Sequence, residues 1–219
     1  MTNTSCIPSW APRWVTGIRG SRLLLLTSLL LVGVACRAPE GGGPLRGTPL
    51  GVLTPKPDIL LTTTDGAAFD FPRATAGYVT LLFFGYTHCP DICPVHMANL
   101  AAVLHKLPST VAGRVKVIMV TVDPERDTPE RLRAWLDNFD RDFIGLTGSV
   151  ADITAMQQAV RLPPAVKEGE GDTYLVGHAA YVLAFTTDDQ PPVAYPSGTR
   201  QSDWAHDLPQ LARRMERAR

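Results

Sequence analysis

The sequence predicts an α/β fold in which a central sheet carries helices on both faces. Two long apolar runs rich in β-branched and aromatic residues, Tyr78–Tyr86 and Val115–Asp123, have the composition of buried strands. Each run is followed by a segment with helix-start signals, and this alternation is typical of α/β sheets. The chain has 219 residues and is 45% hydrophobic, which suffices for one sizeable core but not comfortably for two. We therefore expect one folded domain.

The first 35 residues have the layout of an export signal. Three arginines precede the apolar run Leu23–Ala35, and the first acidic residue is Glu40. The run has 13 residues, which is shorter than the about 20 that a membrane-spanning helix needs. We therefore expect residues 1–35 to be a cleaved signal peptide.

The apolar run ends in a sequence that resembles a bacterial lipoprotein processing box. Small residues precede Cys36 in "VGVAC", although Gly33 stands where that pattern usually has Leu. The sequence favours lipid attachment at Cys36 over simple cleavage or an uncleaved anchor. We expect the protein on the extracytoplasmic face of the bacterial cell membrane, or in the periplasm if it is cleaved and released, where thiols can oxidise.

Residues 36–57 are rich in Gly and Pro and are predicted to form a flexible tether. The domain is expected to cover residues 58–219. It begins with "DILLTTTDGAAFDF", in which a Thr-Asp-Gly turn separates two short apolar runs and predicts a hairpin.

The run Tyr78–Tyr86 predicts a strand that is buried on both faces. Proline is favoured at the first helical position, so the next helix is expected to start at Pro94. Its apolar stripe consists of Met97, Leu100, Leu104 and Leu107. Cys89 and Cys93 would then lie in the loop between the strand and the helix, at a strand's carboxyl end, where α/β sheets place their sites.

The next elements repeat the pattern of strand and helix. After the second apolar run, Thr128 is a predicted helix cap and Pro129 the first helical residue. Residues 143–148 ("FIGLTG") predict a third strand, and Ser149 with Asp152 marks the start of another helix.

The last part of the chain predicts an insertion, a hairpin and a helix. Residues 161–173 are rich in Pro, Gly and charge and are expected to form an exposed insertion. The runs 181–185 and 193–196 flank "TTDDQPP" and predict a hairpin. Pro209 places the start of the regular part of the C-terminal helix near Leu208.

Charge excludes one class of partner. The 21 Lys and Arg residues balance 21 Asp and Glu residues, and no basic stripe is interleaved with aromatic side chains. Proteins that bind nucleic acids need such a surface to neutralise phosphates. We expect no nucleic-acid partner.

Cys89 and Cys93, the two cysteines of the predicted domain, allow three interpretations. A structural disulfide between them would close a very short loop and contribute little stability. A redox couple is favoured by the nearby helix N-terminus, which promotes thiolate formation, although three residues separate the cysteines instead of the usual two. The third interpretation is a metal site. Paired thiolates are soft ligands that select Cu(I) or Zn, but a metal site requires at least one further ligand.

Five histidines are the candidates for that further ligand. His88 adjoins Cys89 and His96 follows Cys93 by one helical turn, while His178 is remote in sequence and precedes an apolar strand. His105 and His206 are better explained as solvated side chains. Local pattern alone leaves the choice open.

Four motifs, in this order and spacing, resemble the Sco/SenC family of membrane-anchored copper chaperones. They are "FFGYTHCPDICP", "TVDPERDTPERLRAWLDNF", "GLTGS" and "YLVGHAAYVLAF", and the resemblance runs from about Asp58 to the C-terminus. The resemblance implies a thioredoxin-like fold: a central mixed sheet flanked by helices, with an N-terminal hairpin and an insertion before the C-terminal hairpin. It also implies a metallochaperone without catalytic residues.

The resemblance further implies that Cys89, Cys93 and His178 bind copper, as Cu(I) or Cu(II), and deliver it to the binuclear centre of cytochrome c oxidase. The implied partners are the copper-centre subunit of the oxidase, or another copper acceptor, and the membrane. The same cysteines would form a redox disulfide that blocks copper loading. The alternative is a thiol-disulfide reductase that reduces the acceptor's cysteines; peroxide reduction has no separate motif.

The chain departs from the family at one position. Gly177 stands where the family usually has an acidic residue before the histidine. Loss of an outer-shell partner can lower metal affinity or activity by ~10 to 100-fold. Asp123 and Asp127 are equally well explained by turns and helix entry, so they are not assigned to the site.

Overall fold

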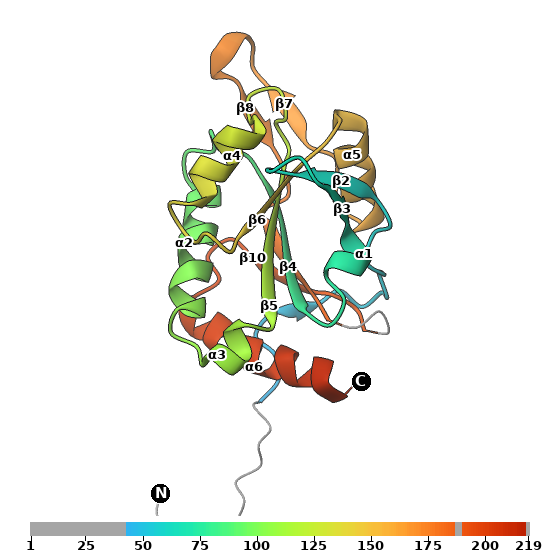
Figure 1. The fold of residues 1–219 in the computed structure, drawn as a ribbon, viewed down its shortest axis with the longest axis vertical. Coiled ribbons are helices and arrows are strands. Elements are labelled where there is room, and N and C mark those ends of the chain that lie inside the picture. The colour runs from blue at the N-terminus through green and yellow to red at the C-terminus, as the bar shows by residue number, and fades with distance from the viewer. Residues whose placement is uncertain (1–42, 187–189, 218–219) are drawn as a thin grey trace, which may run out of the picture. The chain divides into compact units, whose positions relative to one another are not determined.

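The structure, a computed structural model, describes residues 43–186 and 190–217, and the predicted signal peptide and Cys36 lie outside them. The described residues form an eight-stranded mixed sheet in the order β1-β10-β9-β4-β5-β6-β2-β3, flanked by helices (Figure 1). Its strands are β1 (Thr48–Pro49), β2 (Leu60–Thr63), β3 (Ala68–Asp70), β4 (Val79–Gly85), β5 (Val115–Thr121), β6 (Ile144–Thr147), β9 (Tyr181–Phe185) and β10 (Val193–Pro196).

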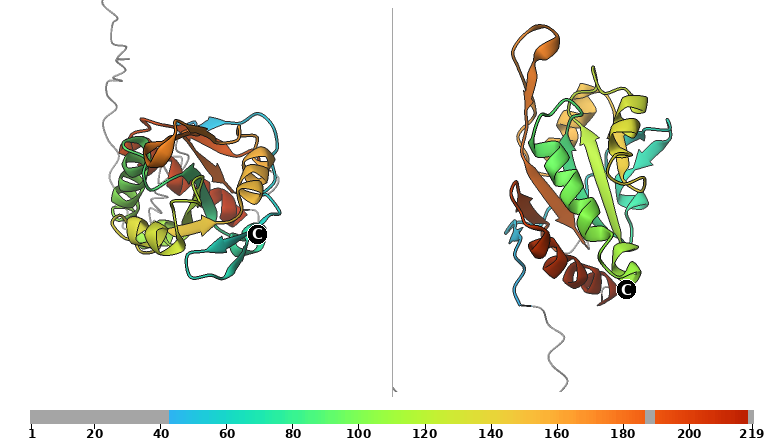
Figure 2. Two further views of the ribbon diagram at one scale, coloured as in Figure 1. Left: turned by 90° about the horizontal axis from the view of Figure 1, so that it is seen from above. Right: turned by 90° about the vertical axis from the view of Figure 1, so that its left-hand side faces the viewer.

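The helices connect these strands and cover both faces of the sheet, as Figure 2 shows from above. They are α1 (Phe71–Ala74), α2 (Ile92–Leu104), α3 (Ser109–Ala112), α4 (Pro129–Leu136), α5 (Val150–Ala159) and α6 (Gln201–Arg217). Among the residues that the structure describes, no helix has both the length and the apolar character needed to cross a membrane.

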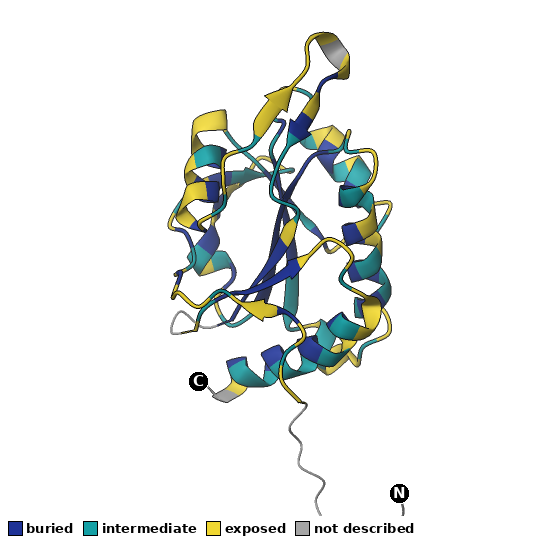
Figure 3. Ribbon diagram, turned by 180° about the vertical axis from the view of Figure 1, so that it is seen from behind, coloured by how far each residue is buried: buried dark blue, intermediate teal, exposed yellow. Residues whose placement is uncertain are grey.

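Strand β4 lies at the centre of the sheet. It pairs in parallel with β5 and antiparallel with β9. All seven of its residues are buried, which confirms the prediction from its continuous apolar sequence (Figure 3). Leu81 and Phe83 pack into the core beneath α2, α4 and α6, whereas Leu82 and Phe84 pack into the core beneath α1 and α5. The alternation follows from the two-residue period of a strand.

Local signals in the sequence placed several other elements correctly. The predicted N-terminal hairpin is β2–β3, and the predicted C-terminal hairpin is β9–β10. The hydroxyl of Thr128 accepts a hydrogen bond from the Arg131 backbone N–H at the start of α4. The hydroxyl of Ser149 accepts one from the Asp152 backbone N–H at the start of α5. Both caps satisfy donors that the helix itself leaves unpaired.

Helix α2 begins two residues before the predicted start. Its first residue is Ile92, so Pro94 lies in the first turn and Cys93 is the second helical residue, not a loop residue. The first-turn N–H groups of a helix have no partner within it, so proline is tolerated there. The prediction that both cysteines lie in the loop is therefore wrong for Cys93 and correct for Cys89.

Helix α6 begins at Gln201, well before the predicted start near Leu208, and contains Pro209 in its interior. Its first turns are held by tertiary contacts. The Trp204 ring stacks on Tyr195 with 4.0 Å between ring centroids, and the Tyr195 hydroxyl donates to Asp207 at 2.9 Å. Packing thus outweighs the backbone hydrogen bond that Pro209 removes.

The folded region begins earlier than the predicted boundary at residue 58. Within the predicted tether (36–57), Thr48–Pro49 pairs with β10 as the edge strand β1. The backbone N–H groups of Arg46 and Gly47 donate to the Asp207 carboxylate at 2.8 and 2.9 Å. A two-residue strand has no periodicity to detect, so composition alone assigned this segment to the tether.

The predicted insertion (161–173) contributes to an exposed hairpin of two short strands, β7 (Val166–Glu168) and β8 (Leu175–Gly177). A 3₁₀ turn at Gly171–Thr173 lies between them. This hairpin projects from the end of the domain opposite α6 (Figures 1 and 2). The sequence predicts its exposure but not its strands, which are only three residues each and are separated by a turn that contains Gly169 and Gly171.

Candidate metal site

Three predicted ligands meet at the carboxyl end of β4. Cys89 lies in the loop after β4, Cys93 in the first turn of α2, and His178 directly after β8. Their ligand atoms all lie within 4.8 Å of one another, and the Cys93 Sγ is 3.6 Å from the His178 Nε2. The chain therefore folds a distant imidazole back onto the thiol pair. Cys93 is buried, whereas Cys89 and His178 are half-buried.

Gly85, the last residue of β4, allows Cys93 to lie this close to the strand. A Cβ atom at this position would lie 2.5 Å from the Phe83 ring and 3.0 Å from the Cys93 Sγ. Real side chains do not pack at such distances, so any larger residue would displace the thiol. The glycine is needed here for close approach and not for an unusual backbone angle.

The orientation of His178 is fixed by its surroundings. Its Nδ1 lies 3.2 Å from the Ala179 carbonyl oxygen, which can only accept, so in the neutral imidazole that binds a metal this contact favours the proton on Nδ1. The lone pair is then on Nε2, which faces the thiols. The rings of Phe83 and Tyr86 pack edge-on against the imidazole with centroid distances of 5.8 Å. The ring is therefore positioned to bind a metal without first changing its tautomer.

Both thiols are free, and they differ in protonation. A hydrogen bond from Cys93 lowers the pKa of Cys89 to about 3, against the opposing effect of burial. The Cys93 backbone N–H also donates to the Cys89 Sγ, at 3.4 Å. Conversely, the hydrogen bond to Cys89 and burial raise the pKa of Cys93. The metal-free site therefore holds a thiolate at Cys89 and a thiol at Cys93.

The other histidines do not join this group. His96 is buried against Phe83, with 5.0 Å between ring centroids, and its desolvation lowers its pKa. His88 contacts Asp127 at 3.6 Å and lies outside the thiol cluster. His105 is exposed and pairs with Asp140 at 2.9 Å, as expected of a surface side chain.

His206 differs from its predicted solvated state. It is half-buried, and its Nδ1 lies 2.6 Å from an Asp207 carboxylate oxygen. It belongs to the packing of α6, on the side of the domain away from the thiols. Of the three histidines that local pattern left open, only His178 forms a described cluster with Cys89 and Cys93.

Two buried carboxylates that the sequence analysis did not assign to the site hold the loops that carry its ligands. Asp127 accepts hydrogen bonds from the Thr87 backbone N–H at 2.9 Å and the Thr121 hydroxyl at 2.7 Å, and so joins the loop after β4 to the end of β5. Asp123 accepts from the Tyr174 hydroxyl at 2.6 Å and so joins β5 to the exposed hairpin. The sequence signal for Asp123 and Asp127 was the "DPERDTP" motif, but turn and helix-entry roles explain these two residues as well as a role at the site does.

A carboxylate from the neighbouring strand lies over Gly177. A Cβ atom on Gly177 would lie 2.5 Å from the Glu168 Oε1. Glu168 also lines, with Cys89 and His178, a cavity of about 270 Å³ that opens beside the thiols. The Glu168 carboxylate thus occupies the space that a side chain at position 177 would enter. Only the register of the hairpin reveals this.

Comparison with known proteins gives the same family as the sequence motifs. A model of the SCO1/SenC family matches residues 56–213. The chain is 33% identical over 164 residues to a putative copper-binding protein of Stutzerimonas stutzeri, and this match covers 71% of the chain and 79% of that protein.

Solved structures extend the likeness to the fold. Bradyrhizobium japonicum ScoI with copper bound has a TM-score of 0.61 at 31% identity, covering 75% of this chain and 98% of that one. A SCO1/SenC family lipoprotein from Bacillus anthracis has a TM-score of 0.61 at 26% identity, covering 77% of this chain and 99% of that one. These matches confirm the thioredoxin-like fold, and together with the family model they show that the chain belongs to the SCO1/SenC family.

Proposed function

We propose that the protein binds one copper ion through Cys89, Cys93 and His178 and delivers it to the binuclear copper centre of cytochrome c oxidase. The observation that carries the proposal is the convergence of three ligand atoms within 4.8 Å of one another. Two sulfur atoms and one imidazole nitrogen form a soft ligand set that suits Cu(I) and can also hold Cu(II).

The comparisons support copper as the cargo. The Stutzerimonas stutzeri relative is named a putative copper-binding protein, and the Bradyrhizobium japonicum neighbour was solved with copper bound. Three ligands leave copper coordinatively unsaturated, so a ligand from an acceptor can approach through the cavity beside Cys89. Binding requires both sulfurs to be deprotonated, so loading releases the proton of Cys93.

A membrane tether completes the proposal. Lipid attachment at Cys36 would hold the domain on the extracytoplasmic face, and the Bacillus anthracis neighbour is described as a lipoprotein of the same family. The described chain starts at Gly43, at the end of the domain away from the exposed hairpin (Figure 1). The copper site lies at the opposite end of the domain from this first described residue, beside the exposed hairpin, where the cavity next to Cys89 leaves it open to an acceptor.

Anaerobic titration of the reduced full chain with Cu(I), read by copper-edge X-ray absorption, tests the ligand set. We expect one copper with two sulfur ligands and one imidazole. Cys89→Ser and Cys93→Ser should each remove a sulfur ligand and weaken binding strongly, whereas the control His105→Ala should change nothing, because His105 pairs with Asp140 at the surface. Stoichiometric binding that survives either serine substitution unchanged contradicts the proposal.

A second function, thiol-disulfide reduction of the acceptor's cysteines, is favoured by the low pKa of Cys89 beside the free thiol of Cys93. Thiol exchange needs no imidazole ligand, so His178→Ala separates the two functions. If this variant loses copper yet supports full assembly of oxidase in cells, the reductase is the physiological activity. If assembly fails along with copper binding, delivery of copper is the activity.

A further inference from the structure

A second cavity lies on the face of the sheet opposite Cys93. Its volume is about 800 Å³, which is within the range of about 300 to 1,000 Å³ of small-molecule sites. Its floor includes Leu183 and Ala194, which belong to the core beneath α1 and α5, whereas Cys93 belongs to the other core. The copper site and this cleft are therefore separated by the sheet itself.

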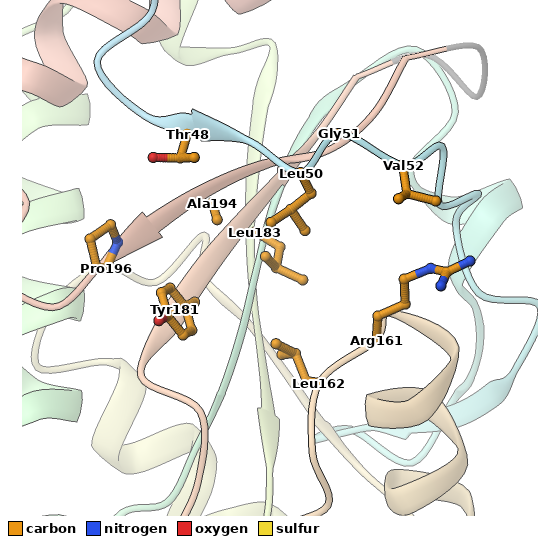
Figure 4. A pocket seen from close by; sticks show the side chains of 10 residues that line it. All are labelled: Thr48, Leu50, Gly51, Val52, Arg161, Leu162, Tyr181, Leu183, Ala194 and Pro196. Atoms are coloured by element: carbon orange, nitrogen blue, oxygen red, sulfur yellow. The ribbon is translucent and has the colours of Figure 1, made fainter.

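The walls of the cleft are apolar and come from segments far apart in sequence. Leu50 and Val52 follow β1, and Leu162 follows α5. Figure 4 shows the side chains of Leu50, Leu162 and Leu183 directed toward a common space. Val52 remains 49% exposed, so this wall of the cleft is open to solvent. Most of the lining side chains are apolar, so an occupant with many polar groups, such as a peptide, would find few side-chain partners for them.

Arg161 is the one charged residue in the lining. Its guanidinium lies beside Val52 at the edge of the cleft (Figure 4). Among the described residues, no carboxylate forms an ion pair with it and no hydrogen bond of its side chain is found. An apolar cleft with one unpaired cation at its edge is complementary to an apolar chain that ends in one anionic group.

The backbone of Arg161 is unusual and holds the side chain at this edge. Its φ of 61° lies in the left-handed region. Its N–H donates to the Gln158 carbonyl, and the Leu162 N–H donates to the Gln157 carbonyl, so the end of α5 has the Schellman hydrogen bonds. Glycine is the residue that this position favours. An arginine here is conformationally unfavourable and is explained if its side chain has a role.

We propose that this cleft binds a long-chain fatty acid anion. The acyl chain lies on the floor of Leu183 and Ala194, between the walls formed by Leu50 and Leu162. The carboxylate pairs with the guanidinium of Arg161, which can donate two parallel hydrogen bonds to it. The site is independent of the copper ligands and of the proposed copper function.

The test uses the full chain in phosphatidylcholine vesicles and a palmitic acid analogue that carries a photoreactive group on its chain. After irradiation, we expect cross-links on the peptides that contain Leu50–Val52 or Leu162, and unlabelled palmitic acid should compete for them. Hexadecanol, which has the same chain without the charge, should compete about tenfold less well, because a charge-assisted hydrogen bond is lost.

Variants at Arg161 separate a specific site from unfolding. Arg161→Gly removes the cation but suits the left-handed backbone, so its thermal unfolding midpoint should be equal to or above that of the wild type. We expect its cross-linking in the cleft to fall about tenfold, whereas the matched control Arg161→Lys keeps the charge and most of the labelling. Copper binding should be the same in all three proteins.

Four outcomes would overturn the proposal. Cross-links confined to other segments would place the probe elsewhere, and equal labelling of the wild type and Arg161→Gly would show that the cation is not involved. Equal competition by hexadecanol would make the cleft a general apolar surface. Loss of labelling in phosphatidylglycerol vesicles, with palmitic acid still present, would identify a phospholipid as the occupant.

Discussion

Cys89 and Cys93 have the same side chain but opposite chemistry in the metal-free protein. Cys89 accepts hydrogen bonds from Cys93 and from the helix backbone, so its thiolate is stabilised. Cys93 is buried and keeps its proton. A metal entering the site therefore meets one ligand that is ready and one that must first release a proton.

This difference predicts the pH dependence of alkylation. Because the pKa of Cys89 is about 3, compared with 9.0 for an ordinary cysteine, Cys89 is already a thiolate throughout the range between these values. We expect iodoacetamide to label Cys89 of the folded, reduced protein at a rate that is nearly constant from about pH 5 to 8. The rate should fall only as the pH approaches 3. Mass spectrometry of quenched samples measures it.

The urea-unfolded chain is the control for this experiment. Below their ordinary pKa, its cysteines should react about tenfold faster for each unit by which the pH rises, because the thiolate fraction then rises tenfold. Cys93 of the folded protein should be labelled last at every pH. A folded-state rate for Cys89 that rises as steeply as in the unfolded chain would contradict the assigned thiolate.

Glu168 and Gly177 form a second pair with a testable dependence on each other. An aspartate at position 177 would place its Cβ 2.5 Å from the Glu168 carboxylate and add a like charge beside it. We therefore expect Gly177→Asp alone to weaken copper binding by displacing the hairpin beside His178. The double variant Glu168→Ala with Gly177→Asp should recover most of the affinity.

Competition with a Cu(I) chelator measures these affinities. Glu168→Ala alone should lower copper affinity by up to ~10 to 100-fold, the range for outer-shell partners. Glu170→Ala, an exposed acidic residue on the same hairpin, is the matched control and should have no effect. Additive losses in the double variant would show that the two positions do not share one space.

The ligands illustrate how far sequence reasoning reaches at this scale. Cys89 and Cys93 are identified by their spacing and by their position after a buried strand. His178 was one of several open candidates until the family resemblance selected it, because its approach depends on a hairpin whose strands are three residues long. Glu168 had no signal at all, since only the pairing of β7 with β8 brings it over Gly177.

At the scale of elements, the site depends on the junction between β4 and α2. The buried strand, the hairpins and the helix caps at Thr128 and Ser149 follow from local patterns, because their causes lie within a few residues. The true starts of α2 and α6 do not, because Pro94 is tolerated in a first turn and Pro209 is retained by packing of Trp204. Tertiary contacts decide these boundaries.

Asp127 gives the test at this scale, because it holds the loop of Cys89 to β5 through Thr87 and Thr121. Asp127→Ala leaves these buried donors without a partner. We expect the free energy of unfolding to fall by about 2 to 4 kcal/mol, from one or two unsatisfied buried groups. Urea unfolding of the reduced, metal-free protein measures this value.

The control for Asp127 is Asp142→Ala, an exposed aspartate at the surface, which should change the stability by less than about 0.5 kcal/mol. Asp127→Ala should also weaken copper binding, because the Cys89 loop loses its support, whereas Asp142→Ala should not. If Asp127→Ala leaves both the stability and the copper affinity unchanged, the loop is held by other contacts.

On the scale of the whole molecule, the copper site, the apolar cleft and the start of the described chain lie on different parts of the domain. The copper site lies at the end that bears the exposed hairpin, and the apolar cleft lies across the sheet from Cys93. The first described residues lie near α6, at the other end (Figure 1). Asp207 joins this start of the chain to the core, because it accepts from the backbone of Arg46 and Gly47 and from the Tyr195 hydroxyl.

Asp207 therefore decides where the proposed tether ends. It is fully buried. Burial of the Tyr195 hydroxyl, together with the negative charge of Asp207, raises the pKa of Tyr195, which remains a hydrogen-bond donor. Asp207→Ala should remove the acceptor of the Arg46 and Gly47 backbone N–H groups and of the Tyr195 hydroxyl, and so release residues 46–50 from the sheet. We expect the free energy of unfolding to fall by about 2 to 4 kcal/mol. Hydrogen exchange by mass spectrometry should show faster exchange at Gly47 and Leu50. Copper affinity should stay the same, because the site is at the opposite end.

Equal exchange rates of residues 46–50 in the wild type and in Asp207→Ala would mean that β1 is held by its pairing with β10 alone. A change in copper affinity would mean that the two ends of the domain are energetically coupled through the sheet.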